Sequence, residues 1–457
     1  MRALRRMVTG AALLIAASAG AGEIAPELEA RLATAGADTL VPVIVRLHEP
    51  SGPPAPAEGP TRGERRRQVL NRLRQTQGAR APLRALADAE ARGAARDVER
   101  YWLVPALTAR ATPDAIRALA DDPQVEAVGV QASAVILPLA EVDELDATPQ
   151  AVNGVVRVRA PQVWALGDRG DGAVVGVVDT GVVANHKDLS GRWRGGAGWK
   201  DLVHQRPTRY DDNGHGTHVT GTAVGHAGVN ANVIGVAPAA TYIACKAFAA
   251  DGYGDIAAIL GCLQFMADPD GNPLTDDLPD VVNGSWGGDV DCDPTFAQAV
   301  RTLRLLDVVS VFASGNAGVP ATPAGYREAI AVGAVDRANV VTAYSGRGPS
   351  SCRQLGAIYP DVVAPGTRVR SAWPGGKRKT LQGTSMAAPH VSGVVALLRS
   401  WKPQLSAAAI GHVVRAAAAD LGPAGPDDEY GYGLVDAFRA VDCLRSGTVN
   451  GCEATCP

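Results

Sequence analysis

Three glycine-rich motifs after residue 150 carry the side chains that nucleophilic acyl transfer requires. Asp179 ends the apolar segment VVGVVD, His215 lies between two glycines in DDNGHGTH, and Ser385 follows Gly-Thr in LQGTSMAAPH. This chemistry needs a hydroxyl nucleophile, a base with a pKa near neutral and a carboxylate that orients the base. Asn316, in ASGNAG, adds an amide that can donate to a developing oxyanion. These residue types predict a hydrolytic site with an Asp-His-Ser triad.

Each of these residues also has a structural interpretation. Ser385 could act only as the N-cap of a helix, and Asn316 could be a turn residue beside its neighbouring glycines. His215 and His218 are three residues apart and lack the glutamate and the four-residue spacing of a zinc helix. His218 and His390 are interpreted as structural. We favour catalysis because the three motifs occur together in one domain, in the order Asp, His, Ser.

The segments around these motifs predict the elements that position them. Five short apolar runs alternate with helical stretches after residue 150, at residues 173–179, 241–247, 280–285, 307–313 and 329–335. Strands that are apolar on both faces are typical of a parallel sheet covered by helices on each side. We therefore predict an α/β domain with a doubly wound, mostly parallel sheet, whose site lies at the carboxyl ends of the strands.

The first 150 residues predict a separate small α+β unit. Its expected elements are a strand at 40–47, a helical region from Arg62 to about Glu99, a strand at 101–109, a helix that begins after Thr112 and a strand at 124–130.

The segments VVDTGV, NGHGTHVTGT, ASGNAG and GTSMAAPHVSG resemble the motifs of the subtilisin-like serine proteases, and the order Asp, His, Ser is the one that subtilisins use. The resemblance extends from about residue 151 to residue 440 and is closest in wording to the bacillopeptidase F branch. It implies a secreted serine endopeptidase with a subtilisin-like fold. In this family the aspartate orients the base, the histidine is general base and then acid, the serine is the nucleophile and the asparagine donates to the oxyanion. These roles fall on Asp179, His215, Ser385 and Asn316.

The resemblance also implies where a substrate binds. Subtilases bind the substrate backbone as an added strand between two protein edges. The wall of the pocket for the residue before the scissile bond is made of small, uncharged residues here, so we expect bulky apolar side chains to be accepted. The residues assigned to substrate binding are Gly252, Tyr253, Gly254, Ser285, Trp286, Gly287, Ala313, Ser314 and Gly315.

The N-terminal part predicts export and processing. Residues 1–21 combine an arginine-rich start, an apolar stretch and a small-residue Ala-Gly-Ala end, which is typical of a cleaved signal peptide. A membrane anchor is the alternative, but the stretch is too short to span a bilayer comfortably. Residues 101–128 resemble the inhibitory propeptide of the family. We expect this propeptide to be a small α+β domain with a ferredoxin-like fold. We predict a signal peptide at 1–21, an inhibitory and chaperone propeptide at 22–145, a catalytic domain at 146–442 and a cysteine-containing tail at 443–457, with autoprocessing between 137 and 150.

Composition narrows the partners. The 457 residues carry a net charge of −3, so no positive field favours nucleic acid as a partner. We expect a monomer without a membrane span. Its expected partners are protein and peptide substrates and its own propeptide, which acts as an inhibitor. All seven cysteines follow residue 240, and an extracellular or periplasmic chain would form at most three disulfides from them. Their pairing stays open.

No cofactor is expected for the chemistry. Asp188 is a candidate ligand of structural calcium, because it corresponds to a calcium ligand in some family members, and Asn230 and Asn232 could supply further oxygens. The segment Asp268-Pro-Asp-Gly-Asn272 is interpreted as a polar turn, since its glycine falls too early for an EF-hand. Two other functions stay open: a catalytically silent subtilase fold that binds proteins, and a non-peptidase acyl hydrolase.

Overall fold

The computed structural model describes residues 22–49, 59–78, 80–131, 133–136, 140–141, 153–226, 233–288, 291–354 and 356–446. The predicted signal peptide, most of the predicted autoprocessing region, and Asn230 and Asn232 lie outside the described residues. The described chain forms two compact units. The first contains residues 22–49, 81–99 and 106–130, and the second contains the remaining segments, including residues 59–80 and 100–105 of the predicted propeptide.

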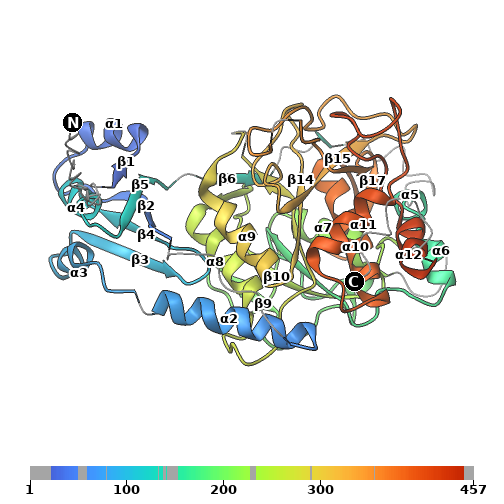
Figure 1. The fold of residues 1–457 in the computed structure, drawn as a ribbon, viewed down its shortest axis with the longest axis horizontal. Helices are drawn as coiled ribbons and strands as arrows, with labels where there is room; N and C mark the ends of the chain where they lie inside the picture. Colours follow the sequence, from blue (N-terminus) through green and yellow to red (C-terminus); the bar gives the residue numbers. More distant parts are fainter. Residues whose placement is uncertain are drawn as a thin grey trace, which may run out of the picture. The chain divides into compact units, whose positions relative to one another are not determined.

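The first unit is an α+β fold with one five-stranded sheet in the order β1-β5-β2-β4-β3 (Figure 1). Four of its strands, together with α3 and α4, follow the β-α-β-β-α-β order of a ferredoxin-like fold. Helix α4 begins where the sequence predicts it, because the Thr112 hydroxyl accepts from the backbone N–H of Ala115 and Pro113 occupies the first helical position. The bounds are β1 (Glu23–Ile24), α1 (Pro26–Thr34), β2 (Val41–Leu47), α3 (Arg84–Ala91), β3 (Ala95–Tyr101), β4 (Ala106–Ala111), α4 (Pro113–Ala120) and β5 (Val125–Val130).

Two sequence predictions in this region are wrong. The helical region from Arg62 to about Glu99 divides into α2 (Arg62–Gly78) and α3, and its last residues belong to β3. The strand predicted at 101–109 is instead the end of β3, a turn and the start of β4. β3 reads ARDVERY and lies at the edge of the sheet, where charged side chains are accommodated, so it lacks the alternation that marks a strand.

The second unit contains a seven-stranded sheet in which every strand pair is parallel, in the order β16-β15-β14-β12-β8-β10-β9. This confirms the doubly wound α/β fold. Val175 and Val177 belong to the large core with residues of α7 and α10, whereas Gly176 between them faces Met266 of α8, so helices cover both sheet faces (Figure 1). The strands are β8 (Val174–Asp179), β9 (Trp199–Asp201), β10 (Thr241–Lys246), β12 (Val281–Gly284), β14 (Val309–Ala313), β15 (Ala329–Val335) and β16 (Val362–Pro365).

Helices and two small sheets complete this unit. One three-stranded sheet has the order β11-β6-β13 and the other β17-β18-β7. The helices are α5 (Asn153–Arg157), α6 (Ala160–Ala165), α7 (His215–Val224), α8 (Ile256–Ala267), α9 (Ala297–Leu305), α10 (Thr384–Trp401), α11 (Ala407–Ala416) and α12 (Ala437–Ser446). The short strands are β6 (Ser133–Ile136), β7 (Ala140–Glu141), β11 (Tyr253–Asp255), β13 (Trp286–Gly287), β17 (Val369–Trp373) and β18 (Lys377–Gln382), and two 3₁₀ turns lie at Lys187–Leu189 and Pro294–Phe296.

Disulfides join parts of the second unit. Cys245 of β10 is bonded to Cys262 of α8, and Cys292 is bonded to Cys352. Cys443 is also disulfide-bonded. Among the helices that the structure describes, none has the length and apolar character needed to cross a bilayer.

Candidate active site

Asp179 and His215 form a buried pair at the carboxyl end of β8. The Nδ1 atom of His215 lies 2.8 Å from Oδ1 of Asp179, and both side chains are at most 1% exposed. The same carboxylate oxygen accepts from the backbone N–H of Thr180 at 2.7 Å. His215 Nε2 is buried and has no hydrogen-bond partner among the described residues. A carboxylate that fixes one ring nitrogen and leaves the other without a partner is the arrangement that a general base needs.

The two glycines beside His215 allow close contact with neighbouring segments. A Cβ atom on Gly216 would lie 2.2 Å from the carbonyl oxygen of Gly181 and 3.0 Å from Oδ1 of Asp179. Gly214 has φ +104°, and a Cβ there would lie 2.5 Å from the ring of Trp373. Glycine is therefore required for helix α7 to begin this close to β8.

Asp211 positions the start of α7, a role that the sequence analysis missed. One of its carboxylate oxygens accepts from the Thr180 hydroxyl at 2.9 Å and from the backbone N–H of Gly214 at 2.7 Å. The other accepts from the backbone N–H of Thr217 at 2.9 Å and from its hydroxyl at 2.6 Å. Asp211 therefore ties the segment after Asp179 to the helix that carries His215. The available signal was an aspartate just before a predicted helix, the position of an N-terminal cap.

Lys246 is a second residue that the sequence analysis missed. It ends β10 in register with Asp179, and its side chain is fully buried. Its ammonium donates to the carbonyl oxygens of Thr180 at 2.8 Å and Phe248 at 2.7 Å and lies 2.6 Å from Oδ1 of Asp212. Three acceptors compensate the three N–H groups, as a buried lysine requires. The signal was a lysine at the end of an apolar strand.

Ser385 and Asn316 are connected at the start of α10. The Ser385 hydroxyl donates to the carbonyl oxygen of Ser285 at 3.0 Å. Oδ1 of Asn316 accepts from the backbone N–H of Thr384 at 2.9 Å and from its hydroxyl at 2.8 Å. These bonds fix the orientation of the Asn316 amide against the residue before Ser385. Helix α10 packs directly against α7, so the proposed nucleophile and base lie on adjacent helices.

An extended segment of the chain lies between the two predicted substrate-binding edges. Strand β6 pairs antiparallel with β11, which contains Tyr253 and Gly254, and antiparallel with β13, which contains Trp286 and Gly287. The backbone N–H of Ile136 in β6 also donates to the carbonyl oxygen of Gly252 at 2.8 Å. A peptide backbone thus adds a strand to both edges, and Ser285 follows β12 directly before β13.

The predicted pocket wall follows β14. Gly315 has φ +115°, and a Cβ there would lie 3.0 Å from Cβ of Ala321, so the wall and the segment after it pack closely. The carbonyl oxygen of Ser314 accepts from the Tyr359 hydroxyl at 2.6 Å, while Ala313 is the last residue of β14. The residues predicted for this wall are buried, small and uncharged.

His218 and His390 have the environments of structural residues. Burial lowers the pKa of His218 to about 3, and its Nε2 lies 3.1 Å from the carbonyl oxygens of both Val369 and Lys379. Burial likewise lowers the pKa of His390 to about 4, with Nδ1 2.9 Å from the carbonyl oxygen of Met386. Both rings are therefore neutral at physiological pH.

Asp188, the candidate calcium ligand, is engaged by an arginine. Nε and Nη2 of Arg378 lie 2.7 and 2.8 Å from its two carboxylate oxygens, and Asp188 is 1% exposed. A bidentate guanidinium competes for the oxygens that a cation would use, so this arrangement argues against calcium at Asp188. A different acidic cluster, formed by Asp268, Asp270 and Asp277, brings three carboxylate ligand atoms within 4.8 Å of one another. Burial and the charge of Asp270 raise the pKa of Asp277 to about 6.

Comparison with known proteins identifies the family. A model of the Subtilase family matches residues 170–433, which is more than half of the chain. The chain is 35% identical over 390 residues to bacillopeptidase F of Bacillus subtilis (strain 168), an alignment that covers 78% of this chain but only 27% of that protein. It is 35% identical over 347 residues to M-protease of Shouchella clausii (strain KSM-K16), covering 75% of this chain and 81% of the relative.

Subtilisin BL of Lederbergia lenta is 38% identical over 290 residues, which cover 63% of this chain and 97% of that protein. The residues matched by the family model include Asp179, His215, Asn316 and Ser385, and no cofactor is needed for catalysis in this family. The chain belongs to the subtilase family of serine endopeptidases.

Proposed function

We propose that the chain hydrolyses peptide bonds of proteins through an acyl-enzyme formed on Ser385. The observation that carries this proposal is the buried pair of Asp179 and His215, with Nε2 of the ring left without a partner next to α10. His215 takes the proton of the Ser385 hydroxyl as the oxygen attacks the carbonyl carbon, and Asp179 stabilises the imidazolium that forms. The Asn316 amide donates to the oxyanion.

The same groups then complete the reaction. The imidazolium gives its proton to the leaving amine, so that the acyl-enzyme remains on Ser385. Water then attacks the acyl carbon while His215 takes its proton, and the second tetrahedral intermediate collapses as the imidazolium returns that proton to Ser385 Oγ, which releases the acid and the free serine. The Ser385 hydroxyl, which here donates to the carbonyl oxygen of Ser285, would donate to His215 Nε2 in the substrate complex, since catalytic hydrogen bonds tighten when substrate binds.

We further infer that residues 22–145 are an inhibitory pro-segment that the enzyme removes from itself. Strand β6 supports this, because it occupies the position in which a substrate backbone would pair with β11 and β13. Residues 100–105 support it as well: the backbone N–H groups of Trp102 and Leu103 donate to Oε1 of Gln264 in α8 at 2.8 and 3.1 Å. The pro-segment would thus block the cleft until the chain is cut.

Three further observations bear on export, on the preferred side chain of the substrate and on a calcium site. The disulfides suit an oxidising compartment, and with the predicted signal peptide they favour an extracellular enzyme. The small residues of the pocket wall favour bulky apolar side chains before the scissile bond. For structural calcium, Arg378 engages both oxygens of Asp188 and Arg74 pairs with Oδ2 of Asp268, so an arginine of the chain competes with a cation at both candidates.

Replacing the nucleophile tests the proposal. The Ser385→Ala chain should be exported as an uncleaved pro-form and should lose about 10⁶-fold in kcat. Normal maturation of this variant in a host without other proteases would refute self-cleavage. A serine-directed phosphonyl reagent separates the alternatives: an adduct on Ser385 of the mature protein excludes a silent fold, and cleavage of simple esters but never of proteins would favour an acyl hydrolase.

A further inference from the structure

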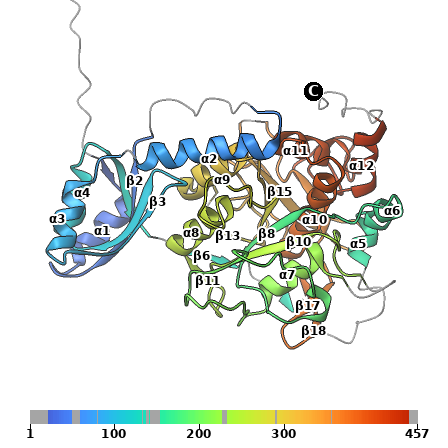
Figure 2. The ribbon, with the colours of Figure 1, turned by 90° about the horizontal axis from the view of Figure 1, so that it is seen from below.

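One helix of the predicted propeptide belongs to the second compact unit, which also contains the predicted catalytic domain. Helix α2 contains six arginines and one glutamate in 17 residues, and Figure 2 shows it as one continuous helix. Such a helix is expected to be solvated, yet Arg62 and Arg66 are only 8% and 3% exposed. They lie one turn apart, and Val69 and Leu70 on the following turns are buried too. The buried stripe of α2 therefore begins with two arginines.

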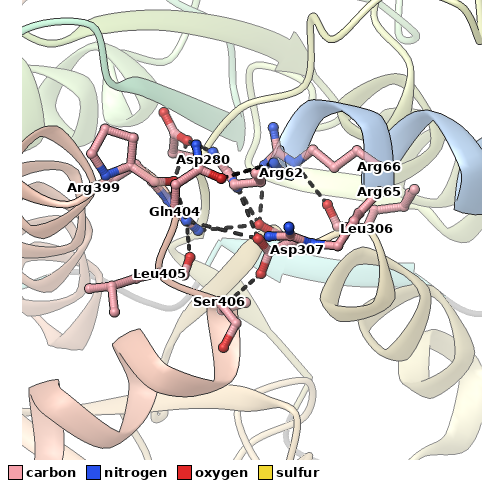
Figure 3. Close-up of polar contacts among 12 residues, drawn as sticks. Arg62, Arg65, Arg66, Asp280, Leu306, Asp307, Arg399, Gln404, Leu405 and Ser406 are labelled. Atoms are coloured by element: carbon pink, nitrogen blue, oxygen red, sulfur yellow. Dashed lines mark hydrogen bonds and ion pairs between the residues drawn. The ribbon is translucent and has the colours of Figure 1, made fainter. Parts of the chain in front are cut away.

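Arg62 uses every nitrogen of its guanidinium. Nη1 lies 2.6 Å from Oδ1 of Asp280, Nε lies 3.0 Å from Oδ2 of Asp307, and Nη2 donates to the Asp307 carbonyl oxygen at 3.0 Å (Figure 3). The backbone N–H of Arg62 donates to Oε1 of Gln404 at 2.9 Å, which satisfies one of the free N–H groups at the start of the helix. Forked, charge-assisted bonds of this kind are the strong ones.

Arg66 is directed mainly at backbone carbonyl groups. Nε donates to the carbonyl oxygen of Leu306 at 2.9 Å, and Nη2 donates to those of Pro279 at 2.9 Å and Asp307 at 3.1 Å (Figure 3). Its Nη1 lies 3.3 Å from Oδ1 of Asp276. Burial lowers the pKa of Arg66 to about 10, so the side chain is still charged at neutral pH. Arginine is the side chain that fits such a set of acceptors, because its donors form a rigid planar fork.

The acceptor groups that bind Arg62 and Arg66 lie at the amino edge of the parallel sheet, where its strands begin. Asp280 directly precedes β12, and its Oδ2 accepts from the backbone N–H of Val174, the first residue of β8, at 2.8 Å. Asp307 precedes β14 by two residues. The same strands end at the opposite edge, where Asp179 is the last residue of β8, and Ser285 and Asn316 follow β12 and β14. The two arginines thus bind the starting ends of the strands whose other ends carry the proposed catalytic site.

Arg399 of α10, in the predicted catalytic domain, contacts the same acceptors. Its Nε lies 3.4 Å from Oδ1 of Asp280, and its Nη2 donates to the Asp307 carbonyl oxygen at 3.3 Å. Without α2, this one guanidinium would face two carboxylates, and the carbonyl oxygens of Leu306 and Pro279 would lose the donors that Arg66 supplies. The acceptors at this edge are therefore arranged for additional guanidinium groups.

We propose that α2 is a second anchor of the pro-segment, which binds the amino edge of the sheet while β6 occupies the cleft. This inference rests on the proposed function of the pro-segment as an inhibitor. A ligand that is bound at two places leaves only when both contacts are broken. The pro-segment therefore stays bound after the chain is cut, and release requires loss of the contacts of Arg62 and Arg66 with the catalytic domain.

The experiment uses the full Ser385→Ala chain, with a recognition site for a second protease placed between residues 142 and 150. After one cut, the dissociation rate of the tagged pro-segment is measured on the immobilised catalytic part. Arg62→Ala with Arg66→Ala should raise this rate about 30-fold or more, as expected for truncation of buried, hydrogen-bonded charges. Arg65→Ala is the matched control, because Arg65 donates to Gly59 in the pro-segment itself, and it should dissociate like the parent.

Each outcome discriminates. If the cut parent complex falls apart at once, retention by the pro-segment fails and the proposed inhibition fails with it. If it persists and the double variant dissociates within twofold of Arg65→Ala, only the α2 anchor is refuted. Should the double variant not fold, Arg66→Lys, which keeps the charge but not the planar fork of donors, gives the answer: faster release supports the anchor, and unchanged release overturns it.

Discussion

Strands β8, β12 and β14 have polar side chains at both ends, but the two ends differ in whether their buried polar atoms have hydrogen-bond partners. At the carboxyl edge, Oδ2 of Asp179 and Nε2 of His215 are buried and lack a hydrogen-bond partner among the described residues. At the amino edge, every guanidinium nitrogen of Arg62 and Arg66 donates. A buried polar atom without a partner costs about 1–3 kcal/mol. The two candidate catalytic atoms carry this cost where a substrate is to react, whereas both buried guanidinium groups of α2 are satisfied; at the amino edge it is Nε of Arg399, in the catalytic domain, that is buried without a hydrogen bond to any described residue.

The largest expected effect breaks the carboxyl edge. Asp179→Asn keeps the size of the side chain but removes the acceptor that fixes His215 Nδ1, so the ring loses the tautomer that a base needs. We expect kcat/KM on a short peptide to fall about 10⁴-fold, measured on protein processed by a trace of active enzyme, and the uncut chain to accumulate otherwise. A loss below tenfold would show that Asp179 does not orient the base.

The next effect tests the amino edge through stability. Asp280→Ala leaves the Arg399 guanidinium and the Val174 N–H without their carboxylate. Breaking a buried ion pair in this way costs about 3–5 kcal/mol, measured as the free energy of unfolding in denaturant in the Ser385→Ala background, where self-digestion is absent. Asp276→Ala is the control, because its carboxylate is one-third exposed and should contribute under about 1 kcal/mol. Equal effects would mean that burial does not distinguish the two carboxylates.

The strands and the candidate catalytic residues at the carboxyl edge could be predicted from the sequence, but the buried arginines at the amino edge could not. The apolar runs predicted β8, β10, β12, β14 and β15 to within two residues, because buried parallel strands have a strong local pattern. The motifs likewise identified the pair that the structure brings together, Asp179 and His215. Arg62, in contrast, meets Asp280 across 218 positions. An arginine on a charged helix has the same local pattern whether water or a distant carboxylate receives it, so its burial could not be predicted.

Sequence reasoning also failed for residues that support the site from one step away. Lys246 and Asp211 contact neither substrate edge, and their types gave no catalytic signal. Their importance comes from tertiary contacts with Thr180 and Thr217, which the local pattern does not contain. The edge strand β3 was missed for a related reason, since its charged residues are accommodated by its place in the sheet.

Asn316 provides a smaller test of the carboxyl edge. Asn316→Ala removes the amide donor, and kcat should fall about 10²–10³-fold with little change in KM, because the bond is made only in the transition state. Asn316→Asp is the matched variant, since it keeps an acceptor for the Thr384 N–H and hydroxyl but has no amide N–H to donate. It should lose at least as much activity. Recovery of activity in this variant would mean that Asn316 only holds Thr384 in place.

The smallest effect concerns the histidines that are not catalytic. Burial lowers the pKa of His218 to about 3 and that of His390 to about 4, from an ordinary value near 6.5. The unfolded chain binds their protons first as pH falls, so the stabilisation is fully present above about pH 6.5 and is lost as pH falls toward 4. Each ring should contribute a slope of up to about 1.4 kcal/mol per pH unit.

His390→Gln isolates this contribution from that of carboxylates, which titrate in the lower part of the same range. The free energy of unfolding of the Ser385→Ala chain, with and without His390→Gln, is compared from pH 7 to pH 4.5. The difference between the two chains should change steadily below pH 6.5, because only the parent must keep His390 neutral against its ordinary pKa. A constant difference would show that the pKa of His390 is not lowered in the folded protein.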